Sequence, residues 1–274
     1  MNRSKRLLAV YAHPDDEAFT AGGTSAAITE RGGQITLICA TRGEAGEISD
    51  PAIATTQSLG SVREAELRSA MRSLGVSDIR FLDFRDSGMR GTPDNDHPLA
   101  FANADERQVV GQLIDVMREV RPDFVVTFGE DGIYGHPDHV KAHRVATAAV
   151  AGYTDELNSD GPALYFNAVP RVRIIEDMAK RTTGPYVNMT PEELAKLGTP
   201  EDQITTRLDV SAQLDRKMAA LLAYRTQFGT SGPLSDLPAD TRRDLLSTEQ
   251  FRLEVNPEPG SDPLLDYLGM SGTE

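Results

Sequence analysis

The chain has 274 residues, of which 39% are hydrophobic, enough for one large domain with a sizeable core. Its formal net charge of −14 argues against nucleic acid and anionic membrane surfaces as partners, because both are bound by basic patches. No apolar stretch approaches the roughly 18 residues of a membrane span, and the apolar run before His13 is too short for a signal-peptide core. The single Cys39 cannot form an internal disulfide, which fits a cytoplasmic protein. Oligomeric state is left open, a homo-oligomer included.

The first 150 residues alternate apolar, β-branched runs with amphipathic stretches, a pattern typical of a parallel sheet flanked by helices. The strands are expected at 7–12, 35–40, 79–84 and 124–128, and the helices at 20–31, 61–74, 105–120 and 138–151. The start of the second helix is predicted from Ser61 and Glu64, which have the spacing of a capping box. Two long loops, 42–60 and 85–104, each follow a strand and should overhang the same edge of the sheet.

The pattern weakens after residue 162. Further strands are expected at 163–169, 171–177 and 205–210, a short helix is expected after Thr190, and a longer helix is expected from Leu214 to Leu222. The Pro- and Gly-rich tail after 255 is expected to pack loosely. The predicted fold class is therefore α/β, with a Rossmann-like, mostly parallel sheet flanked by helices. Residues 1–162 would form the catalytic core, and 163–274 a smaller mixed portion that completes the same domain and covers the pocket.

Two motifs concentrate the residues that carry chemistry. Residues 12–17 read Ala-His-Pro-Asp-Asp-Glu and follow the first strand, and residues 134–139 read Tyr-Gly-His-Pro-Asp-His and follow the fourth. In a doubly wound sheet of order 3-2-1-4-5, strands 1 and 4 are neighbours, and ligands bind at their carboxyl ends. The two motifs should therefore face each other across one crevice.

Imidazoles and carboxylates gathered in this way predict a catalytic metal site with three protein ligands and one open position. The expected ligands are His13, Asp16 and His139, with Asp15 beside them as general base for water activated by the metal. His143 is disfavoured because a fourth protein ligand would close the site. The metal is expected to be Zn²⁺, although two His and one carboxylate also suit Fe²⁺ or another divalent ion.

The remaining groups of the second motif have two open assignments. His136 is placed either to stabilise an oxyanion or to protonate a leaving amine, and Asp138 would hold His136 in its charged form. A Gly-x-Ser-x-Gly elbow, a Walker loop and a dinucleotide-binding fingerprint are not found after the first strand, so these motifs offer no rival scheme.

At these residues the sequence resembles the LmbE-like (PIG-L) superfamily of zinc-dependent N-acetylglucosaminide deacetylases, most of all the branch of the mycothiol and bacillithiol pathways. The resemblance rests on residues 13–17, 41–47, 85–89 and 134–139. It implies the same metal ligands and the same base, a mobile phenol at Tyr134, and substrate contacts from Arg63, Asp86 and Glu47. One departure is Tyr224, which stands where family members often carry a His.

The leading hypothesis is a hydrolase that removes acetate from an N-acetylglucosamine conjugate, a small amino-sugar substrate, through water activated by the metal. One alternative is an amidase of the same family that cleaves thiol S-conjugates. Another is a sugar-binding protein without catalysis, which the intact set of His13, Asp15, Asp16, His136 and His139 disfavours.

Overall fold

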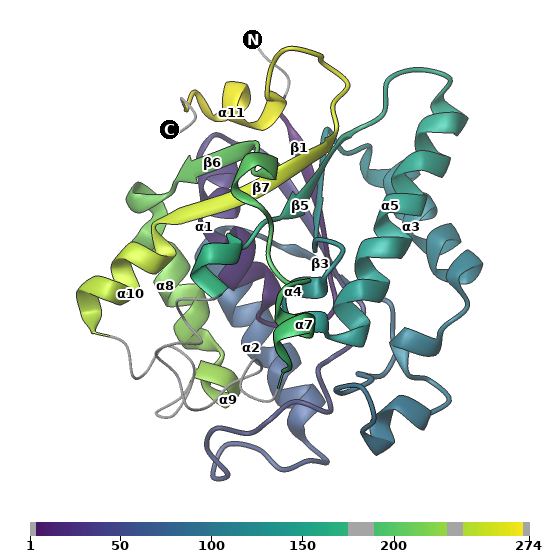
Figure 1. The fold of residues 1–274 in the computed structure, drawn as a ribbon, viewed down its shortest axis with the longest axis vertical. Helices are drawn as coiled ribbons and strands as arrows, with labels where there is room; N and C mark the ends of the chain where they lie inside the picture. The colour runs from purple at the N-terminus through teal and green to yellow at the C-terminus, as the bar shows by residue number, and fades with distance from the viewer. Residues whose placement is uncertain (1–3, 175–188, 229–237, 271–274) are drawn as a thin grey trace.

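Seven strands form one mixed sheet that divides two layers of helices (Figure 1). The structure, a computed structural model, describes residues 4–174, 189–228 and 238–270. The strands are β1 (Arg6–Tyr11), β2 (Gln34–Cys39), β3 (Asp78–Phe81), β4 (Phe124–Thr127), β5 (Ala163–Asn167), β6 (Thr206–Asp209) and β7 (Thr248–Val255). The predicted α/β fold class is confirmed.

The helices occupy most of the remaining chain. The longer ones are α1 (Asp16–Glu30), α2 (Leu59–Leu74), α3 (Glu106–Val120), α5 (Pro137–Leu157), α8 (Leu214–Ala223) and α10 (Ala239–Leu246). The short ones are α4 (Gly132–Gly135), α7 (Pro191–Leu194), α9 (Arg225–Phe228) and α11 (Pro263–Leu268). Single 3₁₀ turns are η1 (Pro93–Asp96), η2 (Phe101–Asn103), η3 (Glu201–Gln203) and η4 (Ser211–Gln213).

The strand order is β3-β2-β1-β4-β5-β7-β6, which confirms the predicted order 3-2-1-4-5 for the first five strands. These five strands are parallel, so their carboxyl ends share one edge of the sheet. Strand β7 pairs antiparallel with both β5 and β6. Strands β1 and β4 are hydrogen-bonded neighbours, which brings the two motifs that follow them together.

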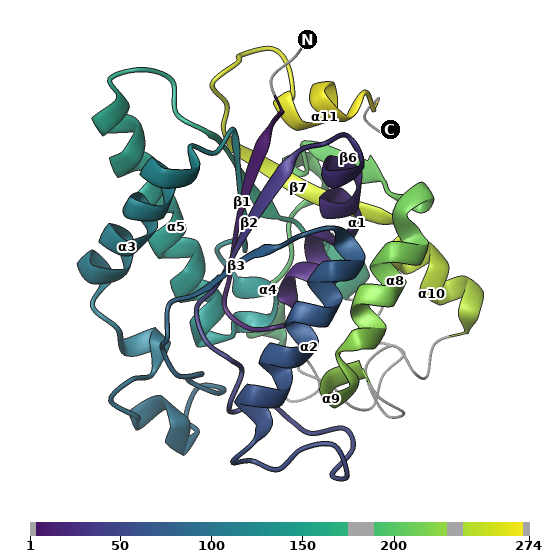
Figure 2. The ribbon, with the colours of Figure 1, turned by 180° about the vertical axis from the view of Figure 1, so that it is seen from behind.

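Helices α3 and α5 pack on one face of the sheet, and α1, α2 and α8 form the layer on the other face (Figures 1 and 2). The central strands are buried on both faces because they lie between these layers. Leu8, Val10, Val125 and Val126 are buried accordingly. The two long loops extend beyond the carboxyl ends of β2 and β3, at the bottom of the view in Figure 1.

Several predicted boundaries differ from the structure. Helix α2 begins at Leu59, so Ser61 lies inside it, and its hydroxyl donates to Ser58 instead of capping the helix. Residues 171–174 are helical where a strand was expected, and 175–177 lie outside the described residues. Within the tail, residues 262–268 are packed and do not lie loosely, because Asp262 caps α11 and Leu264 and Leu268 are fully buried; residues 271–274 lie outside the described residues.

Strand β7 is absent from the prediction for a physical reason. Its inward-facing position Glu249 is charged, which hides the apolar alternation that marks a half-buried strand. Lys217 of α8 neutralises this carboxylate at 2.7 Å, and both side chains are almost fully buried. Across the three described stretches, no helix is long and apolar enough to cross a bilayer.

Candidate metal centre and active site

The first motif forms the turn between β1 and α1. The Asp16 carboxylate accepts the backbone N–H of His13 at 2.8 Å, which closes the turn and fixes the two side chains on one side of it. Asp15 precedes the helix with φ 109°, a left-handed conformation that is uncommon for a residue other than glycine. This backbone geometry lets the adjacent Asp15 and Asp16 carboxylates point to different neighbours.

The second motif forms the start of α5. His136 is the N-cap residue, and Pro137 occupies the first helical turn, where its missing N–H has no cost. The ring of His139 stacks on Phe128, with centroids 4.0 Å apart, and its Nδ1 lies 3.1 Å from the carbonyl oxygen of Gly132. Because a carbonyl oxygen only accepts, Nδ1 carries the proton and Nε2 presents a lone pair to the site.

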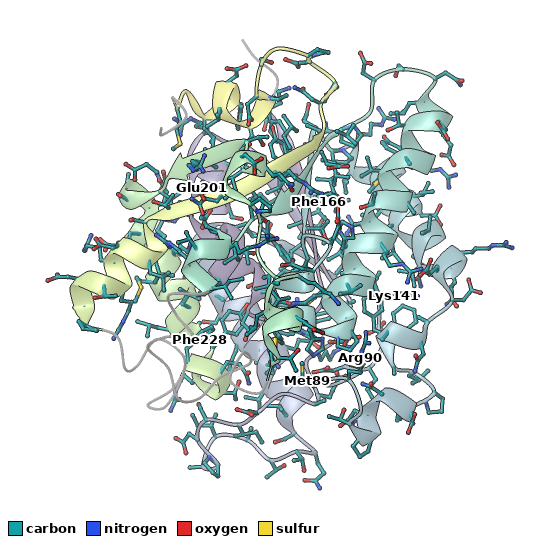
Figure 3. The ribbon with its side chains drawn as sticks, viewed as in Figure 1. Met89, Arg90, Lys141, Phe166, Glu201 and Phe228 are labelled. Carbon is teal, nitrogen blue, oxygen red and sulfur yellow. The ribbon has the colours of Figure 1, made fainter. Side chains whose placement is uncertain are left out.

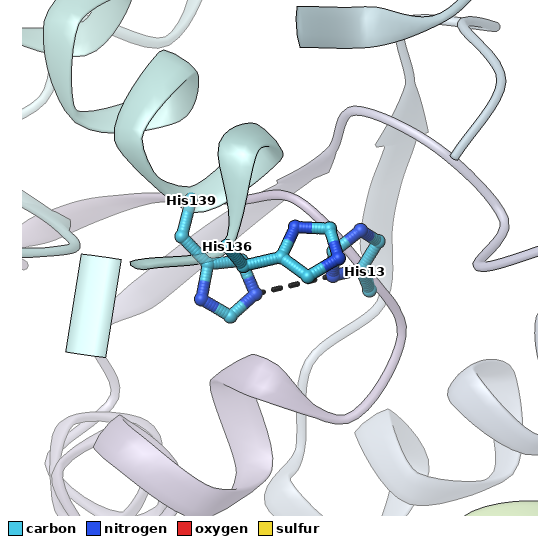
Figure 4. Close-up of side chains that lie close together, drawn as sticks. All are labelled: His13, His136 and His139. Carbon is cyan, nitrogen blue, oxygen red and sulfur yellow. Dashed lines mark hydrogen bonds between the residues drawn. The ribbon is translucent and has the colours of Figure 1, made fainter. Parts of the chain in front are cut away.

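Three predicted metal ligands converge at the point where the motifs meet. His13 Nδ1 lies 3.2 Å from His139 Nε2; of the two Asp16 carboxylate oxygens, Oδ2 lies 3.5 Å from His13 Nδ1 and Oδ1 lies 3.3 Å from His139 Nε2. Tetrahedral zinc with bonds of about 2.0–2.1 Å holds its ligand atoms about 3.3 Å apart. The spacing of these atoms therefore fits one divalent cation. Figure 4 shows the ring of His136 next to those of His13 and His139.

Carboxylates hold the His13 ring from its far side. His13 Nε2 lies 3.2 Å from Asp138 Oδ2 and 3.4 Å from Asp86 Oδ1, so the proton sits on Nε2 and the lone pair on Nδ1. Burial opposes a charge on this imidazole, but Asp86, Asp138 and Asp16 raise the pKa of His13 well above its ordinary value. The site thus favours a positive charge here, either a second proton on Nδ1 or a metal ion in its place. Once that proton leaves, the Nε2–H tautomer offers the Nδ1 lone pair to the metal.

This geometry differs from the expected pairing of Asp138 with the His136 ring. The Asp138 carboxylate accepts from the backbone N–H and hydroxyl of Ser87, at 2.9 and 2.5 Å, and contacts His13. Its contact with His136 runs instead from the Asp138 backbone N–H to ring Nδ1, at 3.2 Å. Ser87, which sequence reasoning missed, carries no signal beyond its place in the segment 85–89.

His136 is a neutral hydrogen-bond donor in this setting. Burial, together with His13 and His139, lowers the pKa of His136 to about 2, so the ring does not carry the charge that Asp138 was expected to maintain. Because Nδ1 accepts the Asp138 N–H, the ring proton sits on Nε2. This tautomer suits donation to an oxyanion better than protonation of an amine.

Asp15 is held apart from the three ligands by Arg63. The Arg63 guanidinium lies 3.2 Å from Asp15 Oδ2 and donates to the carbonyl oxygens of Pro14 and Gly43, at 2.5 and 3.0 Å. Burial raises the pKa of Asp15 to about 7, and the attraction of Arg63 limits that rise. A carboxylate whose pKa lies near neutrality is suited to accept and return a proton.

The three expected substrate contacts have different surroundings. Arg63 is 3% exposed and faces Asp15. Asp86 is buried and accepts the backbone N–H groups of Ala45 and Gly88, so it ties the two long loops together behind His13. Glu47 is exposed and is not among the described residues that line the cavity beside the site. The first two therefore contact Asp15 and His13, and none of the three is among the described residues that line that cavity.

A cavity of about 650 Å³ opens beside the site at Tyr134. The Tyr134 ring stands edge-on to His139 and His136, with centroids 5.1 and 6.0 Å apart, so it lies between the cavity and the imidazoles. Met89, Arg90 and Phe166, labelled in Figure 3, line its walls, and residues 196–200 of the C-terminal portion line it too.

Two further residues were not given a role from the sequence. Glu17 is buried behind Asp15, and one of its oxygens accepts the phenol O–H of Tyr224. His143, the disfavoured fourth ligand, lies 3.0 Å from the carbonyl oxygen of Phe128 through Nδ1.

Comparison with known proteins agrees with this geometry. The family described as PIG-L, GlcNAc-PI de-N-acetylase, matches residues 8–150. A Thermobifida fusca protein named 1D-myo-inositol 2-acetamido-2-deoxy-alpha-D-glucopyranoside deacetylase is 40% identical, covering 94% of this chain and 96% of its own. A Geodermatophilus obscurus protein of the same name is also 40% identical, covering 92% and 93%.

Solved structures share the fold at lower identity. The N,N'-diacetylchitobiose deacetylase of Pyrococcus horikoshii aligns with a TM-score of 0.59 at 20% identity, covering 97% of this chain and 86% of its own. The 4-carboxy-2-hydroxymuconate hydratase of Pseudomonas putida aligns with a TM-score of 0.60 at 21% identity, covering 94% and 99%. The fold therefore accommodates more than one reaction, and membership follows from the sequence match. The chain belongs to the PIG-L family.

Proposed function

We propose that this protein is a metal-dependent hydrolase that removes acetate from an N-acetylglucosamine conjugate, and that its substrate is the 2-acetamido-2-deoxy-glucopyranoside of myo-inositol for which its relatives are named. The observation that carries the proposal is the triangle of His13 Nδ1, His139 Nε2 and the Asp16 carboxylate, at the open end of strands β1 and β4. Its donor spacing suits the open metal site that amide hydrolysis requires.

His13, Asp16 and His139 would hold the cation, which we expect to be Zn²⁺, with Fe²⁺ compatible with the same donors. A cation bound there polarises an amide carbonyl and lowers the pKa of water. Asp138 and Asp86 keep the proton of His13 on Nε2, and the Gly132 carbonyl keeps that of His139 on Nδ1. The chain thus presents two lone pairs and one carboxylate toward the same point.

Asp15 would accept the proton of the attacking water while the new C–O bond forms at the acetamide carbon. The same carboxyl group would then return that proton to the departing nitrogen as the C–N bond breaks, which gives acetate and a free amine. One group can serve both steps because its pKa of about 7 makes neither protonation state costly near neutral pH. Arg63 holds this carboxylate in place.

His136 would donate its Nε2 proton to the oxygen that gains charge in the tetrahedral intermediate. A neutral donor that is already oriented needs no rearrangement during the reaction, and such donors commonly contribute 10²–10³-fold in kcat. The Asp138 backbone N–H fixes this orientation through Nδ1. Tyr134, at the mouth of the cavity, would contact the same carbonyl or the sugar.

The part of the substrate beyond the sugar would occupy the cavity beside Tyr134. Its volume of about 650 Å³ lies within the range of small-molecule sites. Because residues 196–200 line it, the C-terminal portion would help to select the aglycone, in one domain with the catalytic core.

A substrate panel tests the proposal. The metal-loaded protein should release acetate from N-acetylglucosaminyl-myo-inositol faster than from N-acetylglucosaminyl-malate. Release of N-acetylcysteine S-conjugates instead would identify the amidase alternative, and binding without turnover would identify the sugar-binding alternative. The Asp15→Asn variant is the matched control, since it keeps the shape of the side chain but cannot take up the proton.

A further inference from the structure

A buried carboxylate lies directly behind the proposed base. Glu17 is 3% exposed, and its Oε2 accepts the backbone N–H of Asp15 at 3.2 Å. Asp15 is the N-cap residue of α1, so this contact resembles the return arm of a capping box, made here from the second helical position. It places an acceptor at the backbone of the residue that has φ 109°.

The other oxygen of Glu17 is engaged by a distant part of the chain. Tyr224 directly follows α8, is 0% exposed, and donates its phenol O–H to Glu17 Oε1. Helix α8 packs along α1 and α2 (Figures 1 and 2), and Tyr224, the residue after it, reaches Glu17 at the first motif. Both oxygens of Glu17 therefore have donors, one from Tyr224 and one from Asp15.

We propose that Tyr224 and Glu17 are positioning residues, which act on the reaction by holding the backbone of Asp15 in the conformation that aims its carboxylate. Tyr224 fixes the rotamer of Glu17, and Glu17 fixes the Asp15 N–H. Arg63 holds the side chain of Asp15, because its guanidinium lies 3.2 Å from Asp15 Oδ2. Asp15 is thus restrained at its backbone and at its carboxylate by separate contacts.

The restraint matters because the conformation of Asp15 is not one that an aspartate adopts readily. A residue other than glycine keeps a left-handed backbone conformation only when several surrounding contacts hold it there. If the Glu17 acceptor turns away, the Asp15 N–H is left without its partner, and the peptide can rotate toward an ordinary helix start. A displaced base lowers the rate sharply, because catalysis depends on the geometry of the reacting groups.

The inference rests on the proposed role of Asp15 as base, so the experiment is a double-mutant cycle between the two residues. Tyr224→Phe removes only the phenol oxygen, and Asp15→Asn removes only the proton acceptor. In the native background, Tyr224→Phe should lower kcat by roughly tenfold, with KM changed by less than about twofold and with metal content unchanged. In the Asp15→Asn background, the same change should lower kcat by less than about twofold, because the group it positions no longer acts.

Tyr165→Phe is the matched control. Tyr165 is equally buried; its phenol donates to Asp262 at 2.8 Å and accepts the backbone N–H of Leu264 at 3.0 Å, at the start of α11 and in contact with neither motif. This variant should lower the melting temperature about as much as Tyr224→Phe does, but it should leave kcat unchanged. A loss of kcat in both variants would show that stability alone is responsible and would overturn the proposal.

A second pair of variants checks the link through Glu17. Glu17→Gln keeps an oxygen that can accept the Asp15 N–H, whereas Glu17→Ala removes it. The Gln variant should therefore retain more kcat than the Ala variant at equal metal content. Equal losses, or additive losses in the cycle, would refute the positioning role. An unaffected kcat in Asp15→Asn would instead refute the proposed base, which separates the two failures.

Discussion

Replacing Asp138 tests how the tautomer of His13 governs metal affinity. Asp138→Ala removes the acceptor for His13 Nε2 and for both donors of Ser87, at a fully buried position. The His13 ring can then carry its proton on Nδ1, the atom that we expect to bind the metal. Loss of such a carboxylate partner typically weakens metal binding by about 10–100-fold, equal to about 1.4–2.7 kcal/mol.

The structure narrows the expected loss of metal affinity. Asp86 Oδ1 remains 3.4 Å from the same nitrogen, so we expect a loss near the lower end, about tenfold, for Asp138→Ala. Adding Asp86→Ala, which removes the remaining acceptor, should bring the loss toward about a hundredfold. Asp138→Asn should keep most of the affinity, because its amide oxygen can accept from His13 while its NH₂ donates to the Ser87 hydroxyl.

Competition with a chromogenic chelator at fixed pH measures these affinities, and circular dichroism confirms that each variant is folded. Equal losses for the Ala and Asn variants would show that charge alone, and not the hydrogen bond to His13, sets the affinity. An unchanged affinity in Asp138→Ala would refute the orientation mechanism altogether.

Three further outcomes are expected. Asp15→Asn should keep its metal and lose about 10²–10⁴-fold in kcat, whereas Asp16→Asn should lose metal first and regain activity when excess metal is added. Steady-state kinetics together with metal analysis measures both effects. Reversed phenotypes would show that the roles of the two residues are exchanged. Glu249→Ala leaves Lys217 buried without its counter-ion and should lower the free energy of unfolding by about 3–5 kcal/mol. Combining it with Lys217→Met should recover part of that loss. Urea denaturation measures both, and a single variant that unfolds like the native protein would contradict the prediction. His143→Ala should leave one metal per chain, since this ring contacts the Phe128 carbonyl, and a substoichiometric metal content would contradict the ligand assignment.

The sequence by itself was sufficient to predict the parallel part of the sheet and to bring the two motifs together. Strands β1 and β4 are apolar runs buried on both faces, and this pattern needs no knowledge of the tertiary structure. The order 3-2-1-4-5 then places the carboxyl ends of these strands side by side, so His13 and His139 could be assigned to one centre although 125 residues separate them.

Contacts between distant segments were decided only by the tertiary structure. Strand β7 depends on Lys217 to neutralise Glu249, an interaction that local alternation cannot reveal. Asp138 is two residues from His136 in the chain, yet the start of α5 turns its carboxylate toward Ser87 and His13.

Arg63 and Tyr224 illustrate the same limit. From the sequence, Arg63 was expected to contact the substrate, but the fold buries it against Asp15. Tyr224 stands where family members often carry a His, and only the packing of α8 on α1 shows that its phenol donates to Glu17. Residue type and spacing determine which chemistry a segment can offer, but the partner of a buried polar group is set by whichever donor or acceptor the packed helices and loops bring within hydrogen-bond distance.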